Sequence, residues 1–91
     1  MTITYHAQKR MQERLIPEEI VNKTIAKGKK MFKNNRLLYR YNIYVVVADM
    51  ENTTVVTVHY ISKINRILQD ISEKFDITIS DAINDYLKYI V

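Results

Sequence analysis

Apolar and polar residues alternate at the start of the chain and then change to a helical spacing. Residues 2–5 place Thr at every second position beside larger apolar or aromatic residues, which predicts a short first strand. In residues 6–15 the apolar positions Ala7, Met11 and Leu15 recur every four residues, as they do on the buried face of an amphipathic helix. The chain is therefore predicted to begin with a strand that is followed at once by a helix.

Residues 16–28 predict a turn and a second helix. Pro17 suits a first helical position, and the acidic residues directly after it suit the positive end of the helix dipole. Gly28 suits the position that follows a helix. The residues expected to face the core are Ile16, Ile20, Thr24 and Ile25.

Three tracts rich in β-branched and aromatic residues follow, and they predict an antiparallel meander. The tracts span residues 37–42, 43–48 and 54–60. The polar residues 49–53 predict the hairpin connection between the last two tracts. Because the middle tract is continuously apolar, we expect a central strand that is buried on both faces.

The C-terminal third predicts two further helices. Ser62 and Ser80 are expected as their N-caps, because a serine hydroxyl can accept a hydrogen bond from a free N–H group at a helix start. The predicted order is βααβββαα, an α+β domain in residues 1–61 with two N-terminal helices packed on an antiparallel sheet. Residues 62–91 form an extension that packs on this core or dimerises. Its apolar faces are Ile64, Ile67, Leu68, Ile71 and Phe75 in one helix and Ile83, Tyr86, Leu87 and Ile90 in the other.

Composition narrows the possible functions. The chain has 91 residues, one Gly, one Pro and no Cys, so we expect a single domain without a flexible linker, a glycine-rich phosphate loop or a disulfide. Two histidines far apart in sequence and scattered carboxylates give no metal-ligand spacing, so neither a metal nor a cofactor is expected. No apolar run approaches the roughly 20 residues that span a bilayer, and a cytoplasmic protein without a membrane partner is expected.

Charge is unevenly distributed along the chain. Residues 1–50 hold ten Lys and Arg against four Asp and Glu, whereas residues 51–91 hold four against six. A polyanion such as RNA would therefore be attracted to the first half. The residues expected to contact phosphates are Lys9, Lys29, Lys30, Lys33, Arg36 and Arg40, and a tyrosine could stack on a base.

His6, Arg10 and Arg14 follow one another at every fourth position and form one stripe of the first helix, which we call the basic stripe. Cleaving RNA without a metal requires a base, an acid and cations that stabilise the charge at phosphorus. His6 could transfer a proton near neutral pH, and the two arginines could grip the scissile phosphate. The alternative is a solvated helix face, in which Glu13 or Glu18 pairs with the arginines and His6 bonds backbone groups.

His59 is the second histidine and the candidate for a second proton-transfer group. Strand alternation puts His59 and Tyr60 on opposite faces, so only one of them can join His6 unless a bulge intervenes. His59 is favoured, with Tyr60 in the core, and the alternative is an exposed edge histidine. The predicted catalytic set is His6, Arg10, Arg14 and His59, with Arg40 facing it.

Two segments together carry a resemblance to a known family. HAQKRMQERLIPEEI, residues 6–20, resembles the start of a family of small uncharacterised proteins related to the RelE and BrnT toxins, and residues 44–60 are similar to that family's closing β-hairpin. The resemblance implies two helices against an antiparallel sheet. For the characterised relatives it implies a metal-independent endoribonuclease that acts on RNA, including ribosome-associated RNA, and is paired with an antitoxin. We therefore expect a toxin-type protein from a mobile element or virus.

Residues 54–91 resemble a different module, the ribbon-helix-helix, in which paired strands of a dimer read the DNA major groove. The strand offers Val55, Thr57 and His59 outward without any Lys or Arg, and this argues against groove binding. Three functions therefore stay open: an RNA-cleaving toxin-type protein, a non-catalytic nucleic-acid-binding regulator, and a small viral interaction or inhibitor protein with the same fold. Apolar and aromatic residues near the chain end predict a homodimer through residues 62–91.

Overall fold

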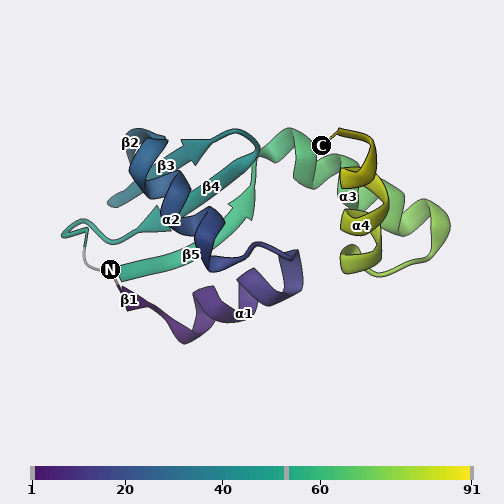
Figure 1. Cartoon of the computed structure of the whole chain (residues 1–91), viewed down its shortest axis with the longest axis horizontal. Helices are drawn as coiled ribbons and strands as arrows, with labels where there is room; N and C mark the ends of the chain where they lie inside the picture. The colour runs from purple at the N-terminus through teal and green to yellow at the C-terminus, as the bar shows by residue number, and fades with distance from the viewer. Residues whose placement is uncertain (1, 53, 91) are drawn as a thin grey trace.

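A computed structural model shows an α+β fold with four helices and a five-stranded mixed sheet (Figure 1). It describes residues 2–52 and 54–90, and residues 87–90 by their backbone alone. In chain order the elements are β1 (Thr2–Ile3), α1 (Tyr5–Arg14), α2 (Glu18–Lys27), β2 (Lys29–Lys33), β3 (Arg36–Tyr41), β4 (Tyr44–Ala48), β5 (Thr54–Tyr60), α3 (Ser62–Phe75) and α4 (Ile79–Ile90).

The strands lie in the order β1-β5-β4-β3-β2. Strands β2 to β5 are antiparallel neighbours, which confirms the predicted meander of β3, β4 and β5. β1 pairs with β5 in the parallel direction. The sheet is therefore mixed, whereas the sequence analysis predicted a purely antiparallel sheet. The sequence analysis also missed β2, because all five of its residues are exposed and no buried alternation marks it.

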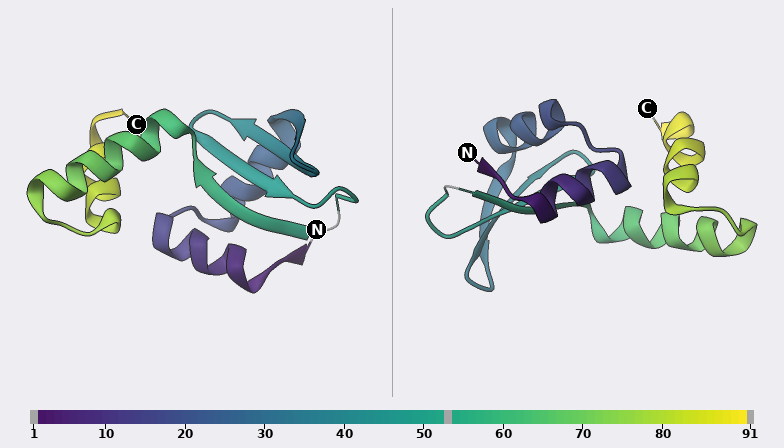
Figure 2. Two further views of the ribbon diagram at one scale, coloured as in Figure 1. Left: turned by 180° about the vertical axis from the view of Figure 1, so that it is seen from behind. Right: turned by 90° about the horizontal axis from the view of Figure 1, so that it is seen from below.

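Helices α1 and α2 lie on the same side of the sheet, whereas α3 and α4 form a helical hairpin beyond the end of β5 (Figure 2). Ala7 of α1 and Val21 of α2 are fully buried against the sheet, and Met11 and Ile20 pack at the edge of this core. The sheet contributes the remaining buried side chains of this layer, namely Leu37, Tyr39, Val46, Ala48, Val55, Val58 and Tyr60.

The first helix begins and ends one residue earlier than predicted. Thr4 caps it by accepting a hydrogen bond from the N–H of Ala7 at 3.1 Å, so Tyr5 is helical and 82% exposed instead of closing a strand. Leu15 then adopts the left-handed conformation with φ of 54°. This turn takes the Leu15 side chain out of the apolar stripe and leaves it 43% exposed, whereas Ile16 is buried in its place.

The second helix is preceded by Pro17 and followed by Gly28. Gly28 has φ of −74°, so a positive φ is not the reason for glycine at this position. A Cβ there would lie 2.2 Å from the carbonyl oxygen of Thr24 and 3.0 Å from that of Arg40. The close approach of α2 to β3 therefore requires glycine.

A β-bulge at Val56 corrects the predicted alternation of β5. Val47 pairs with Thr57 and the next residue of β4, Ala48, pairs with Val55, so Val56 is the extra residue. Val55 consequently faces the core instead of pointing outward. Because β5 pairs with β4 on one side and β1 on the other, it is not a free strand for an intermolecular ribbon.

The helical hairpin is capped differently from the prediction. Ser62 is the first residue of α3 and does not cap it, and the hydroxyl of Thr78, not Ser80, accepts a hydrogen bond from the N–H of Asp81 at 3.1 Å. Ser80 instead donates to the carbonyl oxygen of Glu13 at 3.1 Å and so ties α4 to α1.

Most of the predicted apolar faces of α3 and α4 turn inward. Ile64, Leu68 and Ile83 are buried as predicted, but Phe75 at the end of α3 is 63% exposed. The side chains of Leu87, Tyr89 and Ile90 lie outside the described part of the chain.

Candidate functional site

The sheet has one face covered by α1 and α2 and one open face. Strand register places Lys29, Arg40, Val45 and His59 in one row across the open face, from β2 through β3 and β4 to β5. A depression on this face, which we call the open-face hollow, is lined mainly by apolar and basic side chains. It is lined by Met31, Lys33, Asn34, Arg36, Leu38, Arg40, Val45, Val47, His59, Ile61 and Ser62.

The open-face hollow is cationic. Lys33, Arg36 and Arg40 are all exposed, and Lys29 lies beside Arg40 at the same end of the row. Within the described chain, the residues that line the hollow include no Asp or Glu. The described lining residues also include no tyrosine, so the tyrosine that was predicted to stack on a base beside Arg40 does not line this hollow. Tyr39 and Tyr60 are buried on the helix-covered face.

His59 is partly buried in the hollow and its ring orientation is fixed by the backbone. Its Nδ1 lies 2.8 Å from the carbonyl oxygen of Tyr60, which also accepts a hydrogen bond from Asn65 Nδ2 at 3.0 Å. Because a carbonyl oxygen can only accept, Nδ1 carries the proton. The neutral ring therefore has its lone pair on Nε2, the nitrogen that can take a proton from another group.

The basic stripe of α1 does not reach this hollow. Arg14 donates from its guanidinium to the carbonyl oxygen of Val58 at 2.5 Å, and Tyr60 donates from its hydroxyl to the carbonyl oxygen of Arg14 at 2.5 Å. Arg10 forms an ion pair with Glu13 at 2.9 Å, as the alternative interpretation expected. His6 is exposed at the start of α1.

Burial shifts the pKa of both members of the Arg14–Tyr60 contact. The pKa of Arg14 is lowered by desolvation and then by the nearby charge of Arg10. The pKa of Tyr60 is raised to about 12, first by desolvation and then by Tyr44, whose ring centroid lies 5.7 Å from its own. A guanidinium that donates to β5 in this way serves the packing of α1 on the sheet.

The predicted site residues therefore divide between two surfaces. His59, Arg40, Arg36 and Lys33 meet at the open-face hollow. Arg10 and Arg14 instead line a crevice between α1, the end of β5 and the helical hairpin. Of the remaining predicted phosphate contacts, Lys9 is exposed on α1 and Lys30 has its Nζ 5.9 Å from the ring centroid of Tyr39.

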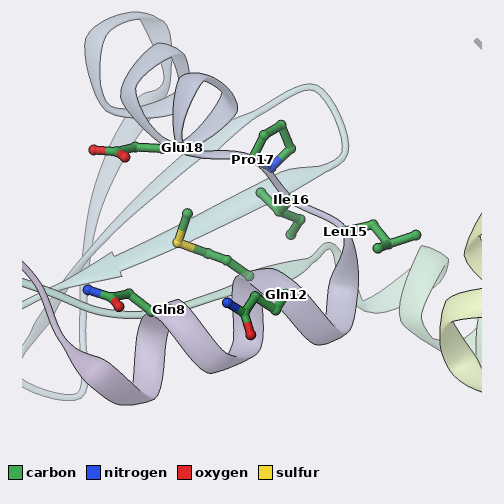
Figure 3. A pocket seen from close by; sticks show the side chains of 7 residues that line it. Gln8, Gln12, Leu15, Ile16, Pro17 and Glu18 are labelled. Atoms are coloured by element: carbon green, nitrogen blue, oxygen red, sulfur yellow. The ribbon is translucent and has the colours of Figure 1, made fainter.

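A third concave surface lies between α1 and α2 (Figure 3). Its apolar part comes from Met11, Ile16 and Pro17, and its rim from polar side chains of both helices. Figure 3 shows that the chain between the helices, from Leu15 to Pro17, closes one end of this groove. Among the described residues that line this groove, Glu18 is the one charged side chain and none is a histidine.

Two features of the described residues bear on metals and membranes. No group of three or more His, Cys, Asp or Glu side chains there could hold a metal ion. None of the helices in residues 2–52 and 54–90 is both long and apolar enough to cross a membrane.

Comparison with known proteins gives one family. Residues 3–60 match the model of a domain of unknown function, DUF4258. The chain belongs to this family. The DUF4258 segment contains α1, α2 and nearly the whole sheet, and it ends just before the helical hairpin begins. It includes every residue that lines the open-face hollow except Ile61 and Ser62. No curated protein and no solved structure matches the chain.

Sequence reasoning missed the contribution of β2 to the site. Its signal was the pair Asn34 and Asn35 between two short runs, because both residues have positive φ, at 51° and 59°, as a type I′ hairpin turn requires. Asn65, which holds the carbonyl group that orients His59, carries no local pattern that could have identified it.

Proposed function

We propose that the open face of the sheet binds RNA and that the protein is a RelE/BrnT-like, toxin-type endoribonuclease that needs no metal. The observation that carries the proposal is that Arg40 and His59 lie in one row across the sheet, within a hollow that has three basic side chains and no acidic one in its described lining. Both residues were in the predicted set, and both lie in the DUF4258 segment.

The spacing of the cations suits a nucleic-acid backbone. Lys29 pairs with Arg40 and Lys33 with Arg36, which gives two cation pairs at opposite ends of the hollow. The two ends are four residues apart along the strand, or about 13 Å. Cations at this separation can contact phosphates two nucleotides apart, and such contacts supply most of the affinity of proteins for nucleic acid backbones.

Cleavage would use His59 and Arg40 together. His59 Nε2 accepts the proton of a ribose 2′-hydroxyl, whose oxygen attacks the neighbouring phosphorus. Arg40, two strands away across β4, stabilises the negative charge that builds up on the phosphoryl oxygens. The bond from phosphorus to the 5′-oxygen then breaks, the leaving oxygen takes a proton from water, and the products are a 2′,3′-cyclic phosphate and a 5′-hydroxyl end.

The test is a matched set of variants assayed for RNA binding and for cleavage in the presence of EDTA. His59→Ala should abolish cleavage and retain binding, and Arg40→Ala should weaken binding by about tenfold, the loss expected for one charge-assisted contact. His6→Ala and Arg10→Ala, which change the same residue types on α1, should leave both unchanged. Equal activity of the wild type and His59→Ala would refute the catalytic proposal.

A second candidate function is RNA binding without cleavage. The lining of the hollow favours this function: among its described residues His59 is the one histidine, and there is no second histidine to act as the acid. RNA binding that depends on Arg40, without any product that carries a cyclic phosphate, would select this second function.

A further inference from the structure

The two edges of the sheet are finished in different ways. Along β5, the carbonyl oxygens of Val56, Val58 and Tyr60 accept hydrogen bonds from the side chains of Thr4, Arg14 and Asn65 respectively. β1 covers the remaining part of this edge. Side chains from the N-cap of α1, from α1 itself and from α3 therefore occupy the positions where another strand would have to pair.

The opposite edge, β2, has no such cover in the described chain. Because Asn34 and Asn35 form a two-residue turn, Lys33 and Arg36 are the hydrogen-bonded pair that closes the hairpin. Alternation then directs the backbone N–H and C=O groups of Lys30 and Phe32 away from β3. Among the hydrogen bonds of the described residues, none involves these outward groups. Figure 1 shows β2 on the outside of the sheet.

The side chains of β2 combine basic and apolar surface. Phe32 is 65% exposed and Met31 is 42% exposed, although both are large apolar residues. The other three residues of the strand are lysines. Lysines alone are a common means of keeping an edge strand unpaired, but they do not explain two large apolar side chains left in water on the same five residues.

The lysines decide which partner fits. If a second copy paired antiparallel to β2 about Met31, Lys29 of each copy would face Lys33 of the other, and like charges directly opposite are unfavourable. An acidic segment would meet opposite charges at the same two positions. Lys29 and Lys33 lie on the open face of the sheet, and Phe32 lies on the other face.

We propose that β2 is a docking edge, where an extended acidic segment of a partner protein adds as a sixth strand. The segment alternates, with acidic side chains on the face of Lys29 and Lys33 and an apolar side chain beside Phe32. The proposal does not depend on RNA cleavage. Because Lys29 and Lys33 also flank the open-face hollow, the docked segment would neutralise cations at both ends of it and compete with RNA.

The probe is a synthetic peptide of alternating Glu and Val residues, with a control peptide of the same composition in which the two residue types are grouped in blocks. We expect the alternating peptide to bind at least about fivefold more tightly than the control, which cannot place its acidic and apolar side chains on opposite faces. Binding should protect the backbone amides of Lys30 and Phe32 from hydrogen exchange. Protection is the decisive signal, because attraction between charges alone would leave these amides exposed.

Two variants at one position separate strand pairing from charge. Lys30→Ala removes a charge and keeps the outward N–H, so it should weaken binding by about twofold. Lys30→Pro also removes the outward N–H, without removing a bond to β3, and should weaken binding by a further fivefold or so. Equal binding by the two variants, binding without amide protection in the wild type, or no preference between the peptides would each overturn the proposal. If Lys30→Pro does not fold, amide protection in the wild type decides by itself.

Discussion

Arg14 and Arg10 lie on the same stripe of α1, but replacing each with Ala should have different effects on stability. Arg14→Ala removes the guanidinium that donates to the carbonyl oxygen of Val58. A hydrogen bond from a charged donor contributes about 1.5–3 kcal/mol when well buried, and Arg14 is only partly buried. We therefore expect a loss of about 1–2 kcal/mol. Arg10→Ala breaks an ion pair between two partly exposed side chains and should cost about 0.5 kcal/mol or less.

The assay is urea unfolding followed by circular dichroism, with thermal unfolding as a second measure. For a domain of this size, each kcal/mol corresponds to a shift in melting temperature of roughly 4–8 °C. The two variants are matched, because they make the same substitution one helical turn apart. Equal stability of Arg14→Ala and Arg10→Ala would refute the conclusion that Arg14 is a structural residue, and would restore the basic stripe as a candidate binding surface.

Three further predictions follow from particular contacts. Gly28→Ala should destabilise the fold by about 2 kcal/mol or more, because the new Cβ would lie 2.2 Å from a backbone carbonyl oxygen of α2; chemical unfolding measures this. The raised pKa of Tyr60, about 12 against an ordinary 10, favours the neutral phenol in the folded state. The stability that the neutral Tyr60 phenol contributes is complete below pH 10 and is lost as the pH rises to about 12. Tyr60→Phe does not titrate, so this variant should not show the same loss of stability over that range. The exposed Phe75 of the helical hairpin supports the predicted homodimer through residues 62–91; light scattering should give a dimer mass at micromolar concentration, and Phe75→Ser should give a monomer.

Local patterns were sufficient to predict the elements that bury a regular apolar face. α1 and α2 were located from the periodicity of their apolar positions, and the three central strands from runs rich in β-branched and aromatic residues, which in β4 are apolar on both faces. β2 has no buried position, so its pairing with β3 depends on the Asn34–Asn35 turn and not on burial. The bulge at Val56 was equally invisible, since it depends on how β4 and β5 are joined and not on the composition of either strand.

Sequence reasoning identified residues of the candidate site but did not predict which of them lie on the same surface. Strand alternation correctly separated His59 from Tyr60. Helical spacing correctly grouped His6, Arg10 and Arg14, but spacing along one helix cannot tell which face of the sheet that helix covers. α1 lies opposite the face of His59, so the two halves of the predicted catalytic set are separated by the sheet itself.

The two histidines of the chain provide the most direct test of the central claim, that the open face of the sheet binds RNA. His59 lies in the open-face hollow and His6 lies on α1, so their imidazole proton signals report separately on the two surfaces. In a titration with a short RNA oligonucleotide followed by proton NMR, the account predicts that the His59 signals shift and the His6 signals do not. Shifts at His6 with His59 unchanged would contradict it and place the RNA on α1.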